Sequence, residues 1–470
     1  MSAPATTEKK YLKWYQKLAY GSGDLASNCS YGLVSSFVLL YLTGTLGLDS
    51  AIIGSLMLAS KVLDGISDVI FGTLIDRTHS KLGKARPWML FGQVGVSLCL
   101  FLLFAIPAGS TTMQYIYFFI VYTALNAVFY TANGIAYSSL VALITKNNNE
   151  RVQLGSFRFM FAVVTNIFMG FAVTGMVEKF GSGAAGWRTT ALIFAIVGLV
   201  VNTISCLAVK ELPEEELSDN TCEAAEEGKA VAKEKKHGFA ETAKILIHNK
   251  YYLMILAIYI VYYIMSNLTT GAGVFCATYY WGDGSLLGQF SMMKMFPVII
   301  ALAIAPVLIK KTGSMQKVNF LGYAISSVLG IPMIYFAMQK NLSMFLLFMF
   351  IKGIFAGTLS GSLNALIAEA SGYTTRTTGV HMDGMMYSCS SLGVKVGGGI
   401  GTAAVGWLLK LGGFVGTATV QSESAIRMIF NLYITFPFVI GIIITVLLAF
   451  LDVEKANKKW DAEHQKEAQA

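Results

Sequence analysis

The stretch ALIFAIVGLVVNTISCLAV, from Ala191 to Val209, carries no charged side chain across its 19 residues. A membrane-spanning helix needs roughly 20 predominantly apolar residues to cross the ~30 Å hydrocarbon core of a bilayer. Similar runs recur along the 470 residues, of which 55% are hydrophobic and 13% charged. Because soluble helices show apolar stripes rather than unbroken runs, we predict an all-α polytopic membrane protein.

Twelve apolar segments are long enough to span a membrane, and a polar stretch divides them six and six. That stretch has acidic and basic runs with few large apolar side chains, as solvated linkers do. We predict an N-terminal six-helix bundle over residues 1–210, a cytoplasmic linker over 211–248, a C-terminal six-helix bundle over 249–452 and a cytoplasmic tail over 453–470. The expected spans are 18–46, 50–75, 86–107, 113–144, 152–178, 188–210, 249–281, 287–309, 315–338, 343–370, 379–410 and 425–452.

The basic residues alternate between loops. They concentrate before span 1, between spans 2 and 3, in the linker and between spans 8 and 9. Because positively charged loops stay cytoplasmic, both termini and the linker are predicted to be cytoplasmic, with the protein in a bacterial inner membrane. Two six-helix halves with such a connector form the major facilitator fold, whose substrate site lies at mid-membrane between the halves.

Other features argue against several functions. The net charge of +8 is explained by cytoplasmic loops, so nucleic acid is not an expected partner. The six cysteines form no CxxC pair, and all except Cys222 lie in apolar segments, which indicates packing. No HExxH or GxxxxGK[ST] motif occurs, so neither a zinc hydrolase nor a nucleotide-driven pump is indicated. We expect no cofactor and no enzymatic activity, an ion gradient as the energy source, and no required oligomer.

Several ionisable residues lie inside predicted spans, where each costs about 2.5 to 3.5 kcal/mol on insertion scales. They are Asp24, Lys61, Asp64, Asp68, Arg158, Lys294, Lys352 and Lys395. Asp64 and Asp68 are four residues apart, so both carboxylates project from one helix face and can share a cation. Close carboxylates suit an alkali cation or a proton, and the pattern leaves the ion open. The alternative is a structural ion-pair network with Lys61.

Three predicted spans carry polar columns at helical spacing. The columns are Asp24, Asn28, Tyr31 and Ser35 in span 1, Tyr122, Asn126, Tyr130, Asn133 and Tyr137 in span 4, and Tyr259, Tyr263, Asn267 and Thr270 in span 7. Carboxylates and amides bind sugar hydroxyls, and aromatic rings cover the apolar face of a sugar, so the columns indicate a polyol site. Tyrosine and asparagine also join helices by hydrogen bonds, so packing stays an equal alternative for each single residue.

Two glycine stripes at four-residue spacing predict close helix packing. They are Gly353, Gly357 and Gly361 in span 10 and Gly393, Gly397 and Gly401 in span 11. Small residues at this spacing let two helix backbones approach closely. Lys395 lies about half a turn off the second stripe, so its ammonium is expected to face a cavity.

The segment from Asp64 to Trp88 resembles the glycoside, pentoside and hexuronide:cation symporters, the family of melibiose permease. The matching positions are Asp64-Gly-Ile-Ser-Asp68, Gly72, Asp76-Arg77-Thr78, Gly83-Lys84 and Arg86-Pro87-Trp88. The likeness recurs at Tyr20-Gly-x-Gly-Asp24, Tyr130-Thr131 through Tyr137, Phe157-Arg158-Phe159, and Asp383-Gly384 with Ser388 and Lys395. It extends over nearly the whole chain.

The resemblance implies roles for single residues. Asp24 and Arg158 look like the family's sugar ligands. The implied cation ligands are Asp64, Asp68 and Thr131, and Asp64 and Asp68 would hold Na⁺ if the protein is sodium-coupled. The implied gate residues, from a cytoplasmic loop whose salt bridges hold one face closed, are Asp76, Arg77 and Arg86. Together with the polar columns, the predicted substrate set is Asp24, Asn28, Tyr130, Asn133, Tyr137, Arg158, Asn267 and Lys395.

Four positions depart from the family's pattern. They are Gly23 in place of a lysine, Gly134 in place of the second sugar-binding aspartate, Gly372 in place of an aspartate and His381 in place of an arginine. Loss of a carboxylate while Arg158, Lys294 and Lys352 are kept makes the cavity more positive, which favours a uronide or another anionic glycoside.

The sequence therefore predicts a secondary active transporter that couples Na⁺ or H⁺ to symport of a sugar or glycoside by alternating access. The expected partners are the sugar, the coupling cation and the lipid bilayer. One alternative is a proton-coupled organic-anion or drug exporter of the same fold, which would have a more purely aromatic cavity. A membrane-embedded enzyme or sugar sensor is a third hypothesis, but neither convergent catalytic groups nor an appended signalling domain is visible.

Overall fold

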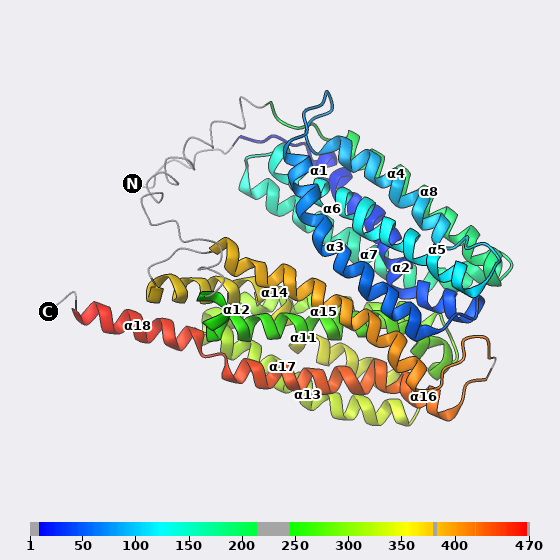
Figure 1. Cartoon of the computed structure of the whole chain (residues 1–470). Coiled ribbons are helices and arrows are strands. Elements are labelled where there is room, and N and C mark those ends of the chain that lie inside the picture. Colours follow the sequence, from blue (N-terminus) through cyan, green and yellow to red (C-terminus); the bar gives the residue numbers. More distant parts are fainter. Residues whose placement is uncertain (1–8, 214–244, 379–382, 419, 468–470) are drawn as a thin grey trace. The chain divides into compact units, whose positions relative to one another are not determined.

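The computed structural model describes residues 9–213, 245–378, 383–418 and 420–467. Within these residues the chain forms helices and no strand. The helices fall into two compact units, one from the chain before the predicted linker and one from the chain after it (Figure 1). Residues 214–244, most of that linker, lie outside the described residues, as do Cys222 and His381, so the predicted domain boundaries stay predictions.

In the first unit, short π-helical turns, labelled η, extend or join some of the α-helices. η1 continues the end of α2, and η2 joins α5 to α6 without a break. The bounds are α1 Trp14–Gly21, α2 Gly23–Leu40, η1 Tyr41–Thr45, α3 Ser50–Asp76, α4 Arg86–Leu103, α5 Thr111–Thr123, η2 Ala124–Tyr130, α6 Thr131–Ile144, α7 Asn148–Lys179 and α8 Gly183–Leu207.

The second unit is built in the same way. η3 extends α11, and η4 joins α16 to α17. The bounds are α11 Lys250–Phe275, η3 Cys276–Trp281, α12 Leu286–Thr312, α13 Met315–Met338, α14 Leu342–Thr378, α15 Asp383–Leu411, α16 Glu423–Phe430, η4 Asn431–Thr435, α17 Phe436–Phe450 and α18 Val453–Glu467.

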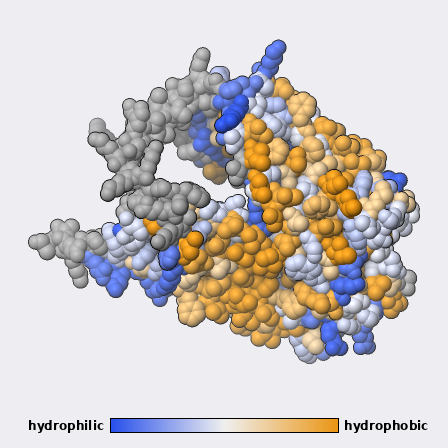
Figure 2. Space-filling model, viewed as in Figure 1, coloured by the Kyte–Doolittle hydropathy of each residue, from blue (hydrophilic) through white to orange (hydrophobic). Residues whose placement is uncertain are grey.

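The structure confirms the polytopic all-α fold class. In the described part of the chain, 11 helical segments are long and apolar enough to cross a membrane. The 27-residue helix α3 is a further long segment, and it holds Lys61, Asp64 and Asp68, so the structure is consistent with twelve spans. Large apolar side chains such as Phe91 and Val328 point outward, and wide apolar areas cover the face seen in Figure 2, as a lipid-facing surface requires.

The C-terminal residues that were predicted as a cytoplasmic tail form helix α18, which contacts α14, and their place in the cytoplasm stays a prediction. Asn457 Nδ2 donates to the Glu369 carboxylate at 2.9 Å, and Arg376 Nη1 lies 3.3 Å from Asp461 Oδ2. The second contact satisfies a charged group beyond residue 370, where span 10 was expected to end. Helix α14 therefore continues to Thr378.

Both glycine stripes are confirmed as packing ridges. A Cβ atom at Gly357 would lie 2.7 Å from Ala301 Cβ on α12, and one at Gly397 would lie 2.4 Å from the Ile260 carbonyl oxygen on α11. Such distances leave no room for a side chain, so these helix pairs depend on glycine. The five cysteines in the described residues are also buried, as predicted for packing residues.

One feature that the sequence analysis missed recurs in both units. The Glu211 carboxylate, which follows α8, accepts hydrogen bonds from the backbone nitrogens of Lys84, Ala85 and Arg86 at 2.7, 3.0 and 3.0 Å. The Glu454 carboxylate, on α18, accepts from those of Met315 and Gln316 at 2.8 and 3.0 Å. Each glutamate thereby caps the N-terminus of a long helix, where N–H groups lack partners and negative charge is favourable.

Candidate functional site

An ion pair inside the first unit joins α2 and α7. Arg158 Nε donates to Asp24 Oδ2 at 2.6 Å, and the guanidinium carbon lies 4.1 Å from the ring centre of Tyr137. The Arg158 and Asp24 side chains are 25% and 17% exposed, so the pair is only partly enclosed. A ligand hydroxyl that reaches it meets a charged donor and a charged acceptor side by side.

Two asparagines extend this pair along the same helices. Asn28 Nδ2 donates to the Asp24 carbonyl at 2.7 Å, and Asn166 Nδ2 donates to Asn28 Oδ1 at 2.9 Å. Asn166 was not among the predicted residues. It follows Arg158 by eight positions, about two helical turns, so a search for polar residues on that face of α7 would have found it.

Two residues of the predicted substrate set are buried in this structure. Asn133 is 3% exposed and donates to Gln93 Oε1 at 2.7 Å, and Tyr137 is 2% exposed and donates to the Tyr20 carbonyl at 2.7 Å. The Tyr137 hydroxyl thus has a protein partner, whereas Asn133 Oδ1 is buried without a hydrogen-bond partner among the described residues, so substrate contact by either residue stays a prediction. Tyr137 instead offers its ring face to Arg158.

A groove of about 510 Å³ between α3 and the segment η2–α6 gathers the predicted cation ligands. Thr131 Oγ1 donates to Asp64 Oδ1 at 2.7 Å, and Asp68 lines the same groove. Lys61 Nζ lies 3.5 Å from Asp64 Oδ2, so part of the alternative ion-pair network is also present. The groove thus offers carboxylate and hydroxyl oxygens, which are the ligands that hard cations prefer.

The groove is also lined by an aromatic ring and by a glycine. Tyr130 lines it and stacks on Tyr31 of α2, with ring centres 5.8 Å apart. Gly134 also lines it, and a Cβ atom there would have no heavy atom within 4 Å. The departure from the family's aspartate at Gly134 therefore leaves open space rather than a packed contact.

The predicted substrate residues Asn267 and Lys395 belong to the second unit. Asn267 Nδ2 donates to the Tyr263 carbonyl at 3.0 Å, and its side chain packs beside Gly398 of α15. Lys395 is partly buried on α15. Their contact with a substrate stays a prediction.

Among the described residues of the first unit, the three predicted gate residues form no ion pair with one another, and their role in a gate stays a prediction. Asp76 and Arg77 are exposed at the end of α3. Arg86 is buried, and its Nε and Nη1 donate to the carbonyls of Cys206 and Leu82 at 3.2 and 3.3 Å. Arg86 therefore ties the start of α4 to α8 in this structure instead of pairing with Asp76.

The long apolar helices and the charged groups inside them define a multi-pass membrane protein with the helical layout of a major facilitator transporter. Residues 19–455 match the family described as MFS/sugar transport protein, and the chain belongs to this family. The resemblance seen in the sequence is thereby confirmed.

Relatives from bacteria match over most of their length. The isoprimeverose transporter of Lactiplantibacillus pentosus is 26% identical over 100% of this chain and 96% of its own. The inner membrane symporter YicJ of Escherichia coli (strain K12) is 24% identical over 92% and 90% of the two chains. The glucuronide carrier protein homolog of the same strain is 24% identical over 86% and 85%.

Solved structures support the fold alone, because their sequence identities are low. A bacterial homolog of the human lysosomal transporter Spinster superposes with a TM-score of 0.68 at 13% identity, covering 95% of this chain and 98% of its own. A D-xylose-proton symporter superposes with a TM-score of 0.62 at 12% identity, covering 94% and 98%.

Proposed function

We propose that this protein couples the movement of Na⁺ or H⁺ to the symport of a sugar or glycoside across a bacterial inner membrane. The observation that carries the proposal is the presence of two neighbouring polar sites within the first unit. The pair Asp24–Arg158 offers charged partners to sugar hydroxyls, and the groove with Asp64, Asp68 and Thr131 offers oxygen ligands to a cation. Names of relatives that include a symporter and sugar carriers support the same function.

The stacked rings of Tyr31 and Tyr130 connect the two sites. Tyr130 lines the cation groove, and Tyr31 follows Asp24 by seven residues, about two turns of α2. A cation in the groove competes with Lys61 for Asp64, and the resulting shift of α3 against η2 reaches α2 through these rings. Coupling then arises because cation and sugar both favour one arrangement of the same helices.

The substrate class that we favour is a uronide or another anionic glycoside. Gly134 leaves the groove without the second sugar-binding aspartate of the family, so the site repels a carboxylate less. One relative is named a glucuronide carrier protein homolog, which supports this choice. Export of an organic anion is the weaker alternative, because amide columns suit a polyol better than an aromatic drug.

The proposed topology places both termini and the linker in the cytoplasm. It rests on the basic residues of alternate loops, such as Arg77, Lys81 and Lys84 between α3 and α4. Alternating access then moves the sugar inward from the far side of the membrane.

Uptake into membrane vesicles tests the proposal. A panel of glycosides that includes melibiose and glucuronides is offered under an imposed Na⁺ or H⁺ gradient to wild type and to Asp68→Asn. We expect one sugar to accumulate in wild type and only to equilibrate in Asp68→Asn. The matched control is Asp283→Asn, at an exposed loop aspartate, which should accumulate normally. Failure of every sugar to accumulate under either gradient would reject the symporter.

A further inference from the structure

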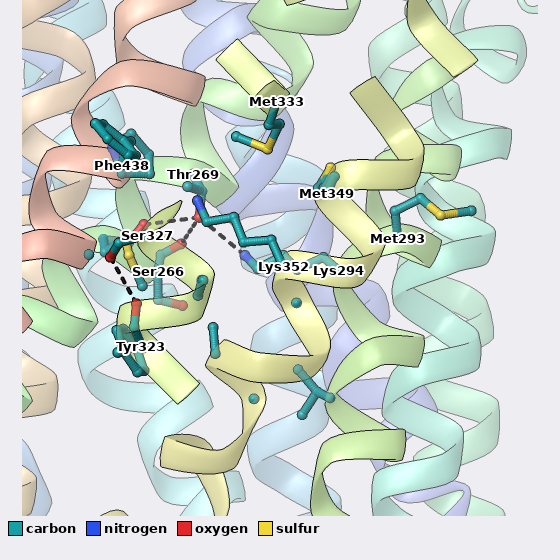
Figure 3. Close-up of a pocket in the computed structure, with 18 of the residues that line it drawn as sticks. Ser266, Thr269, Met293, Lys294, Tyr323, Ser327, Met333, Met349, Lys352 and Phe438 are labelled. Carbon is teal, nitrogen blue, oxygen red and sulfur yellow. Dashed lines mark hydrogen bonds between the residues drawn. The ribbon is translucent and has the colours of Figure 1, made fainter. Parts of the chain in front are cut away.

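A pocket of about 180 Å³ inside the second unit contains two lysines and no acidic residue. It lies among α11, α12, α13, α14 and α17, and Lys294 and Lys352 line it (Figure 3). The close-up shows both side chains reaching toward the space beside Thr269. Two ammonium groups in one apolar interior repel each other and lose hydration, so an arrangement of this kind calls for a negative partner.

Most N–H donors of the two lysines have no acceptor among the described residues. Lys294 Nζ donates to Thr269 Oγ1 at 3.3 Å and to Thr270 Oγ1 at 3.2 Å. These hydroxyls donate their own protons to carbonyls of α11, so they accept from the lysine. Lys352 has no hydrogen-bond or ion-pair partner among the residues that the structure describes. Since each ammonium has three donors, four N–H groups remain for a ligand.

The other walls of the pocket strengthen any charge interaction inside it. Most of the remaining lining is apolar, and it includes Met293, Met349 and Phe438. Charges attract more strongly in such surroundings than in water. The volume is below the roughly 300 to 1,000 Å³ of a site for a whole drug-sized ligand. The pocket therefore suits one anionic group of a larger molecule.

We propose that Lys294 and Lys352 form a subsite that binds the carboxylate of the transported sugar derivative. The inference rests on the proposed function, and it assigns recognition of the acid group to the second unit. A carboxylate has two oxygens that accept several N–H donors, which matches the four that the lysines leave unused. The first unit has a carboxylate pair for the cation, and the second has an ammonium pair for the anion.

A matched pair of ligands tests the subsite. Methyl β-glucuronide and methyl β-glucoside differ only in a carboxylate against a hydroxymethyl group, and their binding to the purified full-length protein is measured by titration calorimetry. We expect wild type to bind the glucuronide at least 10-fold more tightly, which corresponds to about 1.4 kcal/mol. Lys294→Met and Lys352→Met should lose this preference and keep their affinity for the glucoside. Lys310→Met, at the exposed end of α12, should keep the preference.

The outcomes separate this inference from the proposed function. Glucoside binding without any advantage for the glucuronide in wild type would overturn the subsite alone. Absence of binding of both sugars would overturn the subsite and the choice of an anionic glycoside, whereas the symporter itself is rejected only if every sugar of the vesicle panel fails to accumulate. Equal weakening of both sugars in the lysine variants would assign the lysines a structural role and also overturn the subsite. Lys352→Arg keeps the charge and should retain the preference, so it replaces Lys352→Met if that variant fails to fold.

Discussion

The hydroxyl of Thr131 offers a sharp test of the cation groove. Its Oγ1 donates to Asp64 Oδ1 at 2.7 Å, and Thr131→Val removes this group with little change in side-chain size. A hydrogen bond to a charged partner contributes about 1.5 to 3 kcal/mol. The same hydroxyl lies 2.9 Å from the Asn126 carbonyl, and in the cation complex its oxygen would be one of three proposed ligands. Loss of that ligand should raise the half-saturating cation concentration about 10-fold, which corresponds to about 1.4 kcal/mol.

The assay is sugar accumulation in membrane vesicles as a function of Na⁺ at fixed pH, and of the proton gradient at fixed Na⁺. Thr145→Val is the matched control, because Thr145 Oγ1 also donates to a buried carboxylate at 2.7 Å, that of Glu150. It lies between α6 and α7 and does not line the groove. We expect the control to lower thermal stability and to leave the cation dependence unchanged.

The result that refutes the reasoning is equal behaviour of the two variants. If Thr131→Val lowers thermal stability as Thr145→Val does, and the half-saturating cation concentration stays at the wild-type value, Thr131 only holds α3 against α6. The groove would then lose one of its three proposed ligands, and Asp64 and Asp68 would need another partner.

Three further predictions concern the groove, a helix cap and a glycine ridge. Gly134→Asp places a carboxylate in open space of the groove, where it repels the carboxylate of a uronide. Competition assays should therefore show weaker binding of uronides relative to neutral glycosides. An unchanged ratio of the two affinities would remove Gly134 from the site. Glu211→Gln weakens three charge-assisted hydrogen bonds to the start of α4 and should lower the free energy of unfolding by about 1 to 3 kcal/mol. The measurement is the melting temperature, which should fall, while transport at low temperature should be retained. In Gly397→Ala the new Cβ atom would lie 2.4 Å from the Ile260 carbonyl oxygen, so we expect a lower yield of folded protein on size exclusion. In the control Gly155→Ala the new Cβ atom would have no heavy atom within 4 Å, so we expect the wild-type yield.

Features governed by neighbouring residues along one helix could be predicted. Membrane insertion depends on about 20 consecutive side chains, so the apolar runs identified the fold class and nearly all span positions. The four-residue spacing of Gly393, Gly397 and Gly401 likewise placed three small residues on one ridge. Asp64 and Asp68 were expected on one face of one helix, and both line the groove.

Partners on different helices could not be predicted in this way. Asn133 and Asn28 looked alike in the sequence, yet Asn133 is buried against Gln93 whereas Asn28 extends the pair of Asp24 and Arg158. The difference depends on how each helix is rotated about its axis, which packing decides. Sequence spacing carries no information about that rotation when a helix is apolar on all sides.

The sequence by itself determined that this protein is a polytopic helical transporter with charges buried in named spans, because the cost of placing each residue in lipid is local to its own helix. Only the tertiary structure decided which of those charges meet. It brought Arg158 to Asp24, and Lys352 into one pocket with Lys294. Such pairings depend on distances between helices that are far apart in the chain, and packing sets those distances.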